Sequence, residues 1–118
     1  MKRIKLHEEA ELLLGEIRKR INTCGLLFLN HRRSNAQTLA DLDMTVADQR
    51  KIIDHLTVAD YCGGPEEDEK YPWKYIALFG KEYKGVELYI KLSVGLEGTA
   101  VVCISFHEAA YPMIYQFK

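Results

Sequence analysis

The sequence predicts an α+β fold in which helices come first and an antiparallel β-meander follows. The first half carries apolar residues at helical spacing, most clearly between Glu8 and about Asn22. The second half carries runs of period two, and residues 86–94 alternate strictly between apolar and polar side chains. Helices that precede an antiparallel sheet in the chain usually pack on one of its faces. We therefore expect N-terminal helices packed on an antiparallel β-meander.

The N-terminal segment indicates an amphipathic helix followed by a short strand. The apolar stripe of the helix consists of Ala10, Leu13, Leu14, Ile17 and Ile21. Residues 26–29 form a short apolar run that is typical of a buried strand. The next residues, His31, Arg32 and Arg33, form a cationic loop, which is either a solvated turn or a phosphate contact. Arg32 and Arg33 are therefore candidate RNA-binding residues.

A four-residue duplication in the middle of the chain predicts two consecutive helices. Residues 45–48 and 57–60 both read Thr-Val-Ala-Asp, which matches the capping box found at helix starts. The first helix is expected to bury Val46, Ile52, Ile53 and Leu56. The second is expected to last about one turn and to stop at residues 63–65, because Gly-Gly-Pro breaks helices.

Three runs in the C-terminal half predict the strands of the meander. They are residues 73–79, 86–94 and 99–106. Residues 80–85 contain the glycines of a hairpin turn, and residues 95–98 form the second turn. Residues 113–117 are expected to form either a fourth strand or a packed tail.

Length and composition predict a single domain that spans residues 1–118. With 47% apolar residues, a chain of this length can bury a real core. The three cysteines are far apart and lack metal-ligand spacing, so we interpret them as reduced thiols in a cytoplasmic protein. We expect no membrane segment, no metal site and no cofactor.

The formal net charge of −1 conceals an uneven distribution along the chain. Residues 1–33 carry a net charge of +4, residues 34–70 carry −6, and residues 71–118 carry +1, which together give −1. A nucleic-acid-binding protein usually has a clear basic excess. Any RNA contact is therefore expected to be local, through the N-terminal cations and the lysines of the sheet.

The predicted strands place reactive side chains on one face of the sheet. Tyr89 and Lys91 lie on the polar face of residues 86–94, and Val101, Cys103 and His107 are expected to share one face of the next strand. If the two strands pair, Tyr89, Lys91 and His107 share a surface. An acid-base group, a phenol and an ammonium are sufficient for phosphodiester cleavage without a metal. The alternative is structural: a packed tyrosine, a strand-end histidine and a solvated lysine.

Several short motifs, in this order, are similar to a known family. They are Asp60-Tyr61, Trp73, the segment Leu88-Tyr89-Ile90-Lys91-Leu92, and the final Ile104-Ser105-Phe106-His107. Together they resemble the MqsR-type toxins of bacterial toxin-antitoxin systems, which are RelE-like mRNA interferases. The resemblance implies a RelE-like fold, metal-independent endoribonuclease activity on mRNA, and neutralisation by a cognate antitoxin protein.

The resemblance also implies site residues, although the match is incomplete. Tyr89 corresponds to the catalytic-surface tyrosine of the family, Lys74 stands where other members carry a glutamine, and His107 stands where they carry a lysine. Gly63 lies where the family has a nearby lysine. Candidate catalytic residues are thus Tyr89, His107, Lys74 and Lys91. Two alternatives remain: a non-catalytic interaction protein of the same fold and, less favoured, a small-molecule or metal-using enzyme.

Overall fold

The computed structural model describes all 118 residues as three α-helices, one short 3-10 helix and a mixed five-stranded sheet. The helices are α1 (His7–Cys24), α2 (Arg33–Asp41), α3 (Val46–Asp54) and the 3-10 helix η1 (Val58–Asp60). The strands are β1 (Leu26–Phe28), β2 (Tyr61–Glu67), β3 (Tyr75–Tyr83), β4 (Val86–Val94) and β5 (Val101–Glu108). The α+β fold class predicted from the sequence is therefore confirmed.

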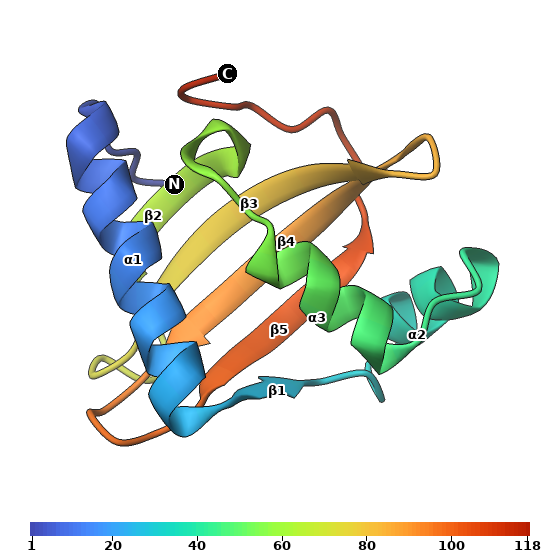
Figure 1. Ribbon diagram of the computed structural model, residues 1–118, viewed down its shortest axis with the longest axis horizontal. Helices are drawn as coiled ribbons and strands as arrows, with labels where there is room; N and C mark the ends of the chain where they lie inside the picture. The colour runs from blue at the N-terminus through green and yellow to red at the C-terminus, as the bar shows by residue number, and fades with distance from the viewer.

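The strands follow the order β1-β5-β4-β3-β2 across the sheet (Figure 1). Strands β2 to β5 pair antiparallel with their neighbours, and β1 pairs parallel with β5. The predicted meander of three strands is present as β3, β4 and β5. The predicted stop at residues 63–65 is wrong, because these residues lie inside β2. The 3-10 helix lasts one turn from its capping box at Thr57, and the chain then enters β2 directly.

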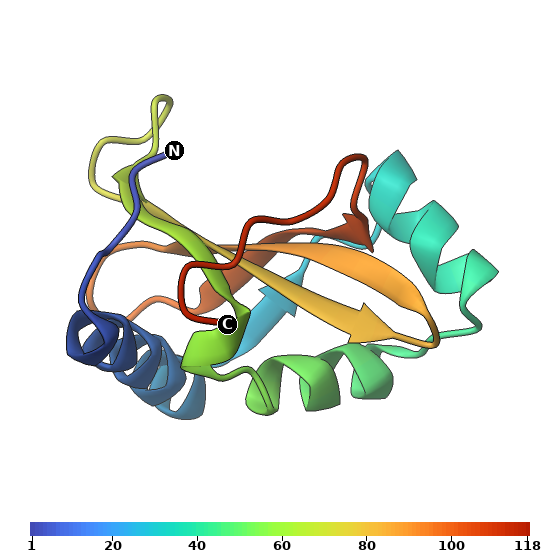
Figure 2. The same cartoon turned by 90° about the horizontal axis from the view of Figure 1, so that it is seen from above.

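Helices α1 and α3 cover one face of the sheet (Figure 2). The apolar stripe of α1 and alternate residues of the central strands, such as Leu88, Ile90 and Leu92, form the core. The capping box of α3 at Thr45 is confirmed. The predicted burial of Val46 is wrong, because this side chain is 56% exposed. The apolar side chains of α3 that pack into the core are Ile52 and Ile53, in the later part of the helix, whereas Val46 is the first residue of the helix and lies in solvent.

The turn between β3 and β4 lies later than the sequence predicts. Strand β3 continues through Gly80 to Tyr83, so the connection consists of Lys84 and Gly85 alone. Both residues have positive φ, 51° and 78°, as a two-residue hairpin turn that follows the sheet twist requires. Gly80 has another role, because a Cβ there would lie 2.7 Å from the hydroxyl of Tyr115.

A β-bulge in β5 corrects the predicted faces of that strand. Lys91 pairs with Ser105, but the next residue of β4, Leu92, pairs with Cys103, which leaves Ile104 as the extra residue. Cys103 therefore faces the core, and His107 faces the opposite side. The prediction that these two side chains share a face is wrong. Strict alternation cannot reveal a bulge, because every residue from 100 to 104 is apolar or small.

Helix α2 was not predicted, because its sequence is too polar to show an apolar stripe. It lies beside β5, at the edge of the sheet (Figure 2). The buried amide of Asn35 fixes it there: Nδ2 donates to the carbonyl of Ile104, and Oδ1 accepts from the amide of Phe106. Asn35 thus attaches α2 to the sheet through hydrogen bonds to the backbone at the bulge. In α1, an apolar stripe serves this purpose.

The two termini meet the far edge of the sheet beside β2. Arg3 forms a parallel bridge with Gly64, and the amide of Gln116 donates to the carbonyl of Tyr61. Residues 113–117 form a tail rather than a fourth strand. None of the helices combines the length and the apolar character that a membrane crossing needs.

Candidate functional site

The face of the sheet opposite α1 and α3 carries the candidate functional residues. We call it the open face, and its alternating side chains come from the three central strands. They are Ile76, Leu78 and Glu82 of β3, Glu87, Tyr89, Lys91 and Ser93 of β4, and Val102, Ser105 and His107 of β5. Tyr89 is directly opposite His107 in the register, and Lys91 is directly opposite Ser105.

Tyr89 and His107 form a parallel ring stack on the open face. Their ring centroids are 5.1 Å apart, and their planes differ by 8°. Lys91 lies next to the stack, with Nζ 5.8 Å from the centroid of the Tyr89 ring. The prediction that Tyr89, Lys91 and His107 share one surface is therefore confirmed. Both rings are partly exposed, so the stack is open to a ligand.

A backbone contact fixes the proton position of the neutral His107 ring. Its Nδ1 atom lies 2.9 Å from the carbonyl oxygen of Glu108. A carbonyl oxygen only accepts hydrogen bonds, so Nδ1 must carry the proton in this contact. In the neutral ring, Nε2 is consequently the unprotonated nitrogen, free to accept a proton. The backbone thus orients the imidazole as a base.

The stack forms part of the wall of a hollow of about 260 Å³, which we call the first hollow. It is lined by Arg3, Cys62, Leu78, Tyr89, His107, Ala110, Tyr111, Pro112, Met113 and Ile114. None of these residues is acidic, and the permanent charge belongs to Arg3. The hollow therefore combines apolar walls, a phenol, an imidazole and a guanidinium.

The N-terminal segment positions Arg3 at this hollow. Its Nε donates to the carbonyl of Cys62 at 3.1 Å, and the amide of Gly64 donates to the carbonyl of Lys2 at 2.7 Å. Gly63 leaves room for this segment, because a Cβ there would lie 2.5 Å from Sδ of Met1. Arg3 thus brings a cation beside the position where the family resemblance leads one to expect a lysine. The sequence predicts a local RNA contact for the N-terminal cations as a group, of which Arg3 is one, but it does not place Arg3 beside Tyr89 and His107.

The C-terminal tail completes the first hollow. Glu87 anchors it, because its carboxylate accepts from the amide of Met113 at 2.8 Å and from the hydroxyl of Tyr115 at 2.9 Å. Phe117 then packs against Tyr61 and His7, with ring centroids 5.9 Å and 5.7 Å away. The residues between this anchor and β5 form one wall of the hollow. The sequence predicts a packed tail as one alternative for residues 113–117, but it does not place the tail beside the stack.

The structure does not bring Lys74, Arg32 and Arg33 to the stack. Lys74 lines a second hollow, of about 240 Å³, near the other end of the central strands. Arg32 donates from Nη1 to the carbonyl of Ile104, which lies three residues along β5 from His107. Arg33 is exposed at the first residue of α2. These three cations therefore lie outside the first hollow.

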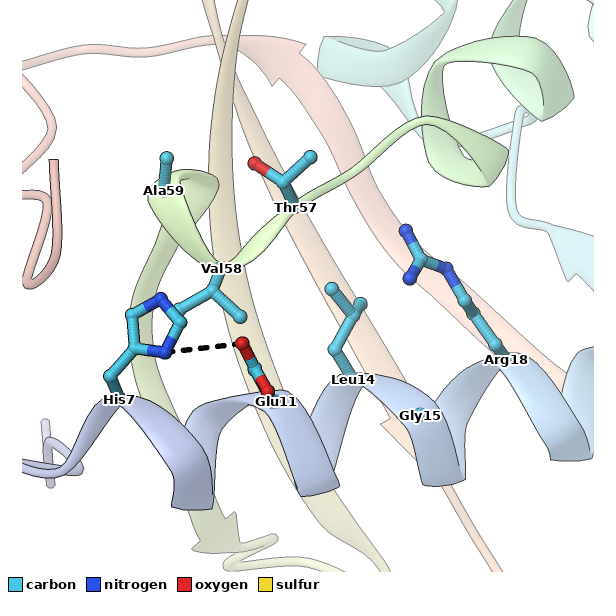
Figure 3. A pocket seen from close by; sticks show the side chains of 8 residues that line it. All are labelled: His7, Glu11, Leu14, Gly15, Arg18, Thr57, Val58 and Ala59. Atoms are coloured by element: carbon cyan, nitrogen blue, oxygen red, sulfur yellow. Dashed lines mark ion pairs between the residues drawn. The ribbon is translucent and has the colours of Figure 1, made fainter.

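The side of the molecule that carries α1 has a different character. A hollow of about 560 Å³ lies between α1 and η1 (Figure 3). Its acid-base groups are paired with each other, since Nδ1 of His7 lies 3.2 Å from Oε1 of Glu11. Its cation, Arg18, donates to the carbonyl of Leu56. The acid-base groups of this hollow therefore pair with each other, whereas Tyr89 and His107 of the first hollow stack without a side-chain hydrogen bond between them.

The cysteines and acidic residues give no sign of metal chemistry. No group of three or more His, Cys, Asp and Glu side chains is arranged to hold a metal ion. Burial, followed by the nearby Glu87 carboxylate, raises the pKa of the Cys62 thiol to about 11. Burial alone raises the pKa of Cys103 to about 12. Both thiols are thus protonated at neutral pH and poor nucleophiles.

Comparisons with protein-family models, with curated proteins and with solved structures gave no match. The structure itself establishes an α+β fold with a mixed five-stranded sheet. Any functional argument therefore rests on the side chains of the open face and on the short motifs of the sequence.

Proposed function

We propose that this protein is a metal-independent endoribonuclease, an mRNA interferase toxin with a RelE-like fold. The observation that carries the proposal is the parallel stack of Tyr89 and His107, with Arg3 and Lys91 beside it. These residues supply a proton acceptor, a proton donor and two cations at one exposed site. The resemblance of the strand motifs to MqsR-type toxins supports the same function.

In the proposed reaction, the 2′-oxygen of a ribose attacks the adjacent phosphorus. His107 Nε2 accepts the 2′-hydroxyl proton as the new oxygen–phosphorus bond forms. The bond from phosphorus to the 5′-oxygen breaks, and the Tyr89 hydroxyl donates its proton to that oxygen. The products are a 2′,3′-cyclic phosphate and a free 5′-hydroxyl, and proton exchange with water resets both side chains. The proton balance needs no metal and no cofactor.

The two cations act on the charge that accumulates at phosphorus. Nε of Arg3 is held by the Cys62 carbonyl, which leaves the terminal nitrogens of the guanidinium for a phosphate. Lys91 adds a point charge near the Tyr89 ring, with Nζ 5.8 Å from the ring centroid. Preorganised cations of this kind stabilise a transition state more than water does, because they need no reorganisation.

The partners that follow from this proposal are mRNA and a cognate antitoxin protein, in the cytoplasm. The rim of the first hollow offers an apolar contact for the antitoxin. Tyr111 is 83% exposed and Ile114 is 63% exposed, and both lie on the tail beside the stack. A protein that covers these side chains also blocks access to His107. Neutralisation by direct coverage fits this arrangement.

A second candidate function is a non-catalytic interaction protein of the same fold. Gly63 occupies the place where the family resemblance leads one to expect a lysine, and the same exposed tail offers a surface for a partner. This alternative needs no proton transfer at Tyr89 and His107. It predicts normal partner binding by a protein that leaves RNA intact.

One assay separates the two functions. Purified protein is incubated with a mixed mRNA in the presence of EDTA, and the ends of the fragments are analysed. Cleavage that yields 2′,3′-cyclic phosphate ends supports the nuclease. Intact RNA, together with unimpaired growth of a bacterial host that expresses the protein, would exclude it in favour of the interaction protein.

A further inference from the structure

The second hollow lies on the open face at a distance from the Tyr89–His107 stack. Its lining residues are Leu27, Trp73, Lys74, Ser93, Gly95, Leu96, Thr99, Ala100 and Val102. Ser93 belongs to β4, four residues after Tyr89, and points to the same face. Four residues of strand span about 13 Å. The two hollows are therefore separated along β4.

Trp73 is the aromatic side chain of the second hollow. It is 55% exposed, and its ring lies 5.4 Å from the ring of Tyr71, which is also exposed. Lys74 and Lys70 place their Nζ atoms 4.8 Å and 5.5 Å from the centroid of the Tyr71 ring. Exposed aromatic rings interleaved with lysines are typical of surfaces that bind single-stranded nucleic acid.

The segment that carries Trp73 is held in place by its own hydrogen bonds. Asp68 Oδ1 accepts from the amides of Lys70 and Tyr71, at 2.8 Å and 3.2 Å. The amide of Asp68 donates to the carbonyl of Lys74 at 3.0 Å. Figure 2 shows this loop, between β2 and β3, rising on the side of the sheet opposite α1 and α3. The rings of Tyr71 and Trp73 are thus held in an exposed position on this side of the sheet.

The side chains that line the two hollows of the open face include cations and no carboxylate. Lys74 is the one ionisable side chain of the second hollow, and the first hollow contains no carboxylate. Lys91 lies between them on β4. Carboxylates lie close to both hollows: Glu87 holds the tail that walls the first one, and Glu16 and Glu67 line an adjoining hollow that also includes Trp73 and Lys74. In a chain with a net charge of −1, a phosphate backbone is therefore expected to meet the cations of the open face locally, at Arg3, Lys91 and Lys74.

We infer that single-stranded RNA lies along the open face and stacks a base on Trp73, remote from the cleaved bond. The phosphate to be cleaved lies at the Tyr89–His107 stack, Lys91 contacts the intervening backbone, and Lys74 contacts the phosphate near the stacked base. This inference rests on the proposed function for the position of the cleaved phosphate, and thus for the way the RNA runs along the open face. It gives Lys74 the role of a binding residue rather than a catalytic one.

The test uses Trp73 as its own probe, because it is the only tryptophan in the chain. The ligand is a 2′-O-methyl RNA oligonucleotide of about eight nucleotides, within the footprint range of single-strand sites. It cannot be cleaved, because it lacks the 2′-hydroxyl. Binding is expected to quench the fluorescence of Trp73, and a label on the oligonucleotide follows binding independently by anisotropy.

Matched variants assign the contact. Trp73→Ala is expected to weaken oligonucleotide binding about 5- to 150-fold, the range that a stacked base contributes. Lys74→Ala is expected to weaken it less and to flatten its salt dependence by about one unit of slope. Leu12→Ala and Lys51→Ala, which change exposed side chains on α1 and α3, are expected to bind like the parent.

The outcomes distinguish this inference from the proposed function. Saturating oligonucleotide with no quenching, or a Trp73→Ala variant that binds like the parent, would overturn the Trp73 contact even if the protein cleaves RNA. Quenching with intact unmodified RNA would support the contact and exclude the nuclease. Quenching by a protein partner but not by oligonucleotide would assign this surface to protein recognition and overturn the inference.

Discussion

Replacing His107 by alanine separates catalysis from folding at the candidate site. If Nε2 of His107 accepts the proton, loss of the imidazole is expected to slow RNA cleavage by about 10²- to 10⁴-fold. That factor corresponds to about 2.7–5.5 kcal/mol of transition-state stabilisation. Tyr89→Phe tests the phenol separately, because it keeps the ring and its stack and removes only the proposed proton donor.

The structural effect of the same change is smaller. His107→Ala removes one ring stack, worth about 0.5–1.5 kcal/mol, and one partly exposed hydrogen bond to Glu108, worth about 0.5–1.5 kcal/mol. From a typical stability of roughly 5–15 kcal/mol, the loss leaves at least about 2 kcal/mol, so more than about nine tenths of the molecules stay folded at 25 °C. Unfolding therefore cannot produce the expected loss of rate.

The assay measures single-turnover cleavage of a defined RNA with EDTA, together with urea unfolding of each variant. Glu108→Ala is a useful control, because it changes the neighbouring side chain but keeps the carbonyl that orients His107. Parental cleavage rates in both His107→Ala and Tyr89→Phe would refute the reasoning. A slow but largely unfolded His107→Ala would instead mean that the stack is part of the core.

Two further predictions concern the tail and the buried ionisable groups. Glu87→Ala removes both hydrogen bonds that hold the tail, so the amide of Met113 is expected to lose hydrogen-exchange protection while the core amides keep theirs. Glu97→Ala serves as the control. Full protection of the Met113 amide in Glu87→Ala would contradict the anchoring role of Glu87. Burial raises the pKa of Cys62 from 9.0 to about 11 and that of Cys103 to about 12, so the folded state binds more protons than the unfolded state above pH 9. The contribution of these two thiols to the free energy of unfolding is therefore expected to be constant from pH 6 to pH 8 and to fall as the pH rises from about 9 to 12. Equal urea midpoints at pH 7 and pH 11 would contradict this expectation.

The sequence predicted the elements whose apolar pattern is strong and local. The stripe of α1, the capping box at Thr45 and the alternation of β4 each depend on neighbouring residues, and each is confirmed. Strand β2 is not predicted, because it contains Gly-Gly-Pro, and glycine and proline are disfavoured in the interior of strands. Helix α2 was missed because it is held by the polar side chain of Asn35, which leaves no period in the hydrophobic pattern.

The candidate site was predicted in part for the same reason. Tyr89 and His107 lie on adjacent strands, so pairing through one short turn was enough to bring them together. The bulge at Ile104 changed the face of Cys103 but preserved that of His107. Arg3 reaches the site from the other end of the chain, through a bridge with Gly64 that no local pattern encodes. Contacts between residues that are far apart in the sequence, such as Arg3 and Gly64, cannot be predicted from a local pattern in one sequence.

Arg3 and Gly63 form a pair whose roles are tested by exchange. Arg3→Ala is expected to reduce cleavage by about 10- to 150-fold, the effect of losing a charge-assisted hydrogen bond of about 1.5–3 kcal/mol, while Lys5→Ala leaves the rate unchanged. Gly63→Lys is expected to fold, because the two atoms that its Cβ would crowd belong to the flexible side chain of Met1, and the backbone oxygen of Lys2 would lie at an ordinary contact distance of 3.5 Å.

In the Arg3→Ala background, Gly63→Lys is expected to restore part of the lost rate by returning a cation to the same hollow. A structural role for Arg3 predicts no rescue, because a lysine on β2 does not rebuild the hydrogen bond from Arg3 to the Cys62 carbonyl. Cleavage rates of the two single variants and the double variant, measured beside their urea midpoints, decide the point. Additive losses in the double variant would remove Arg3 from the proposed machinery and leave Lys91 as the cation next to the stack.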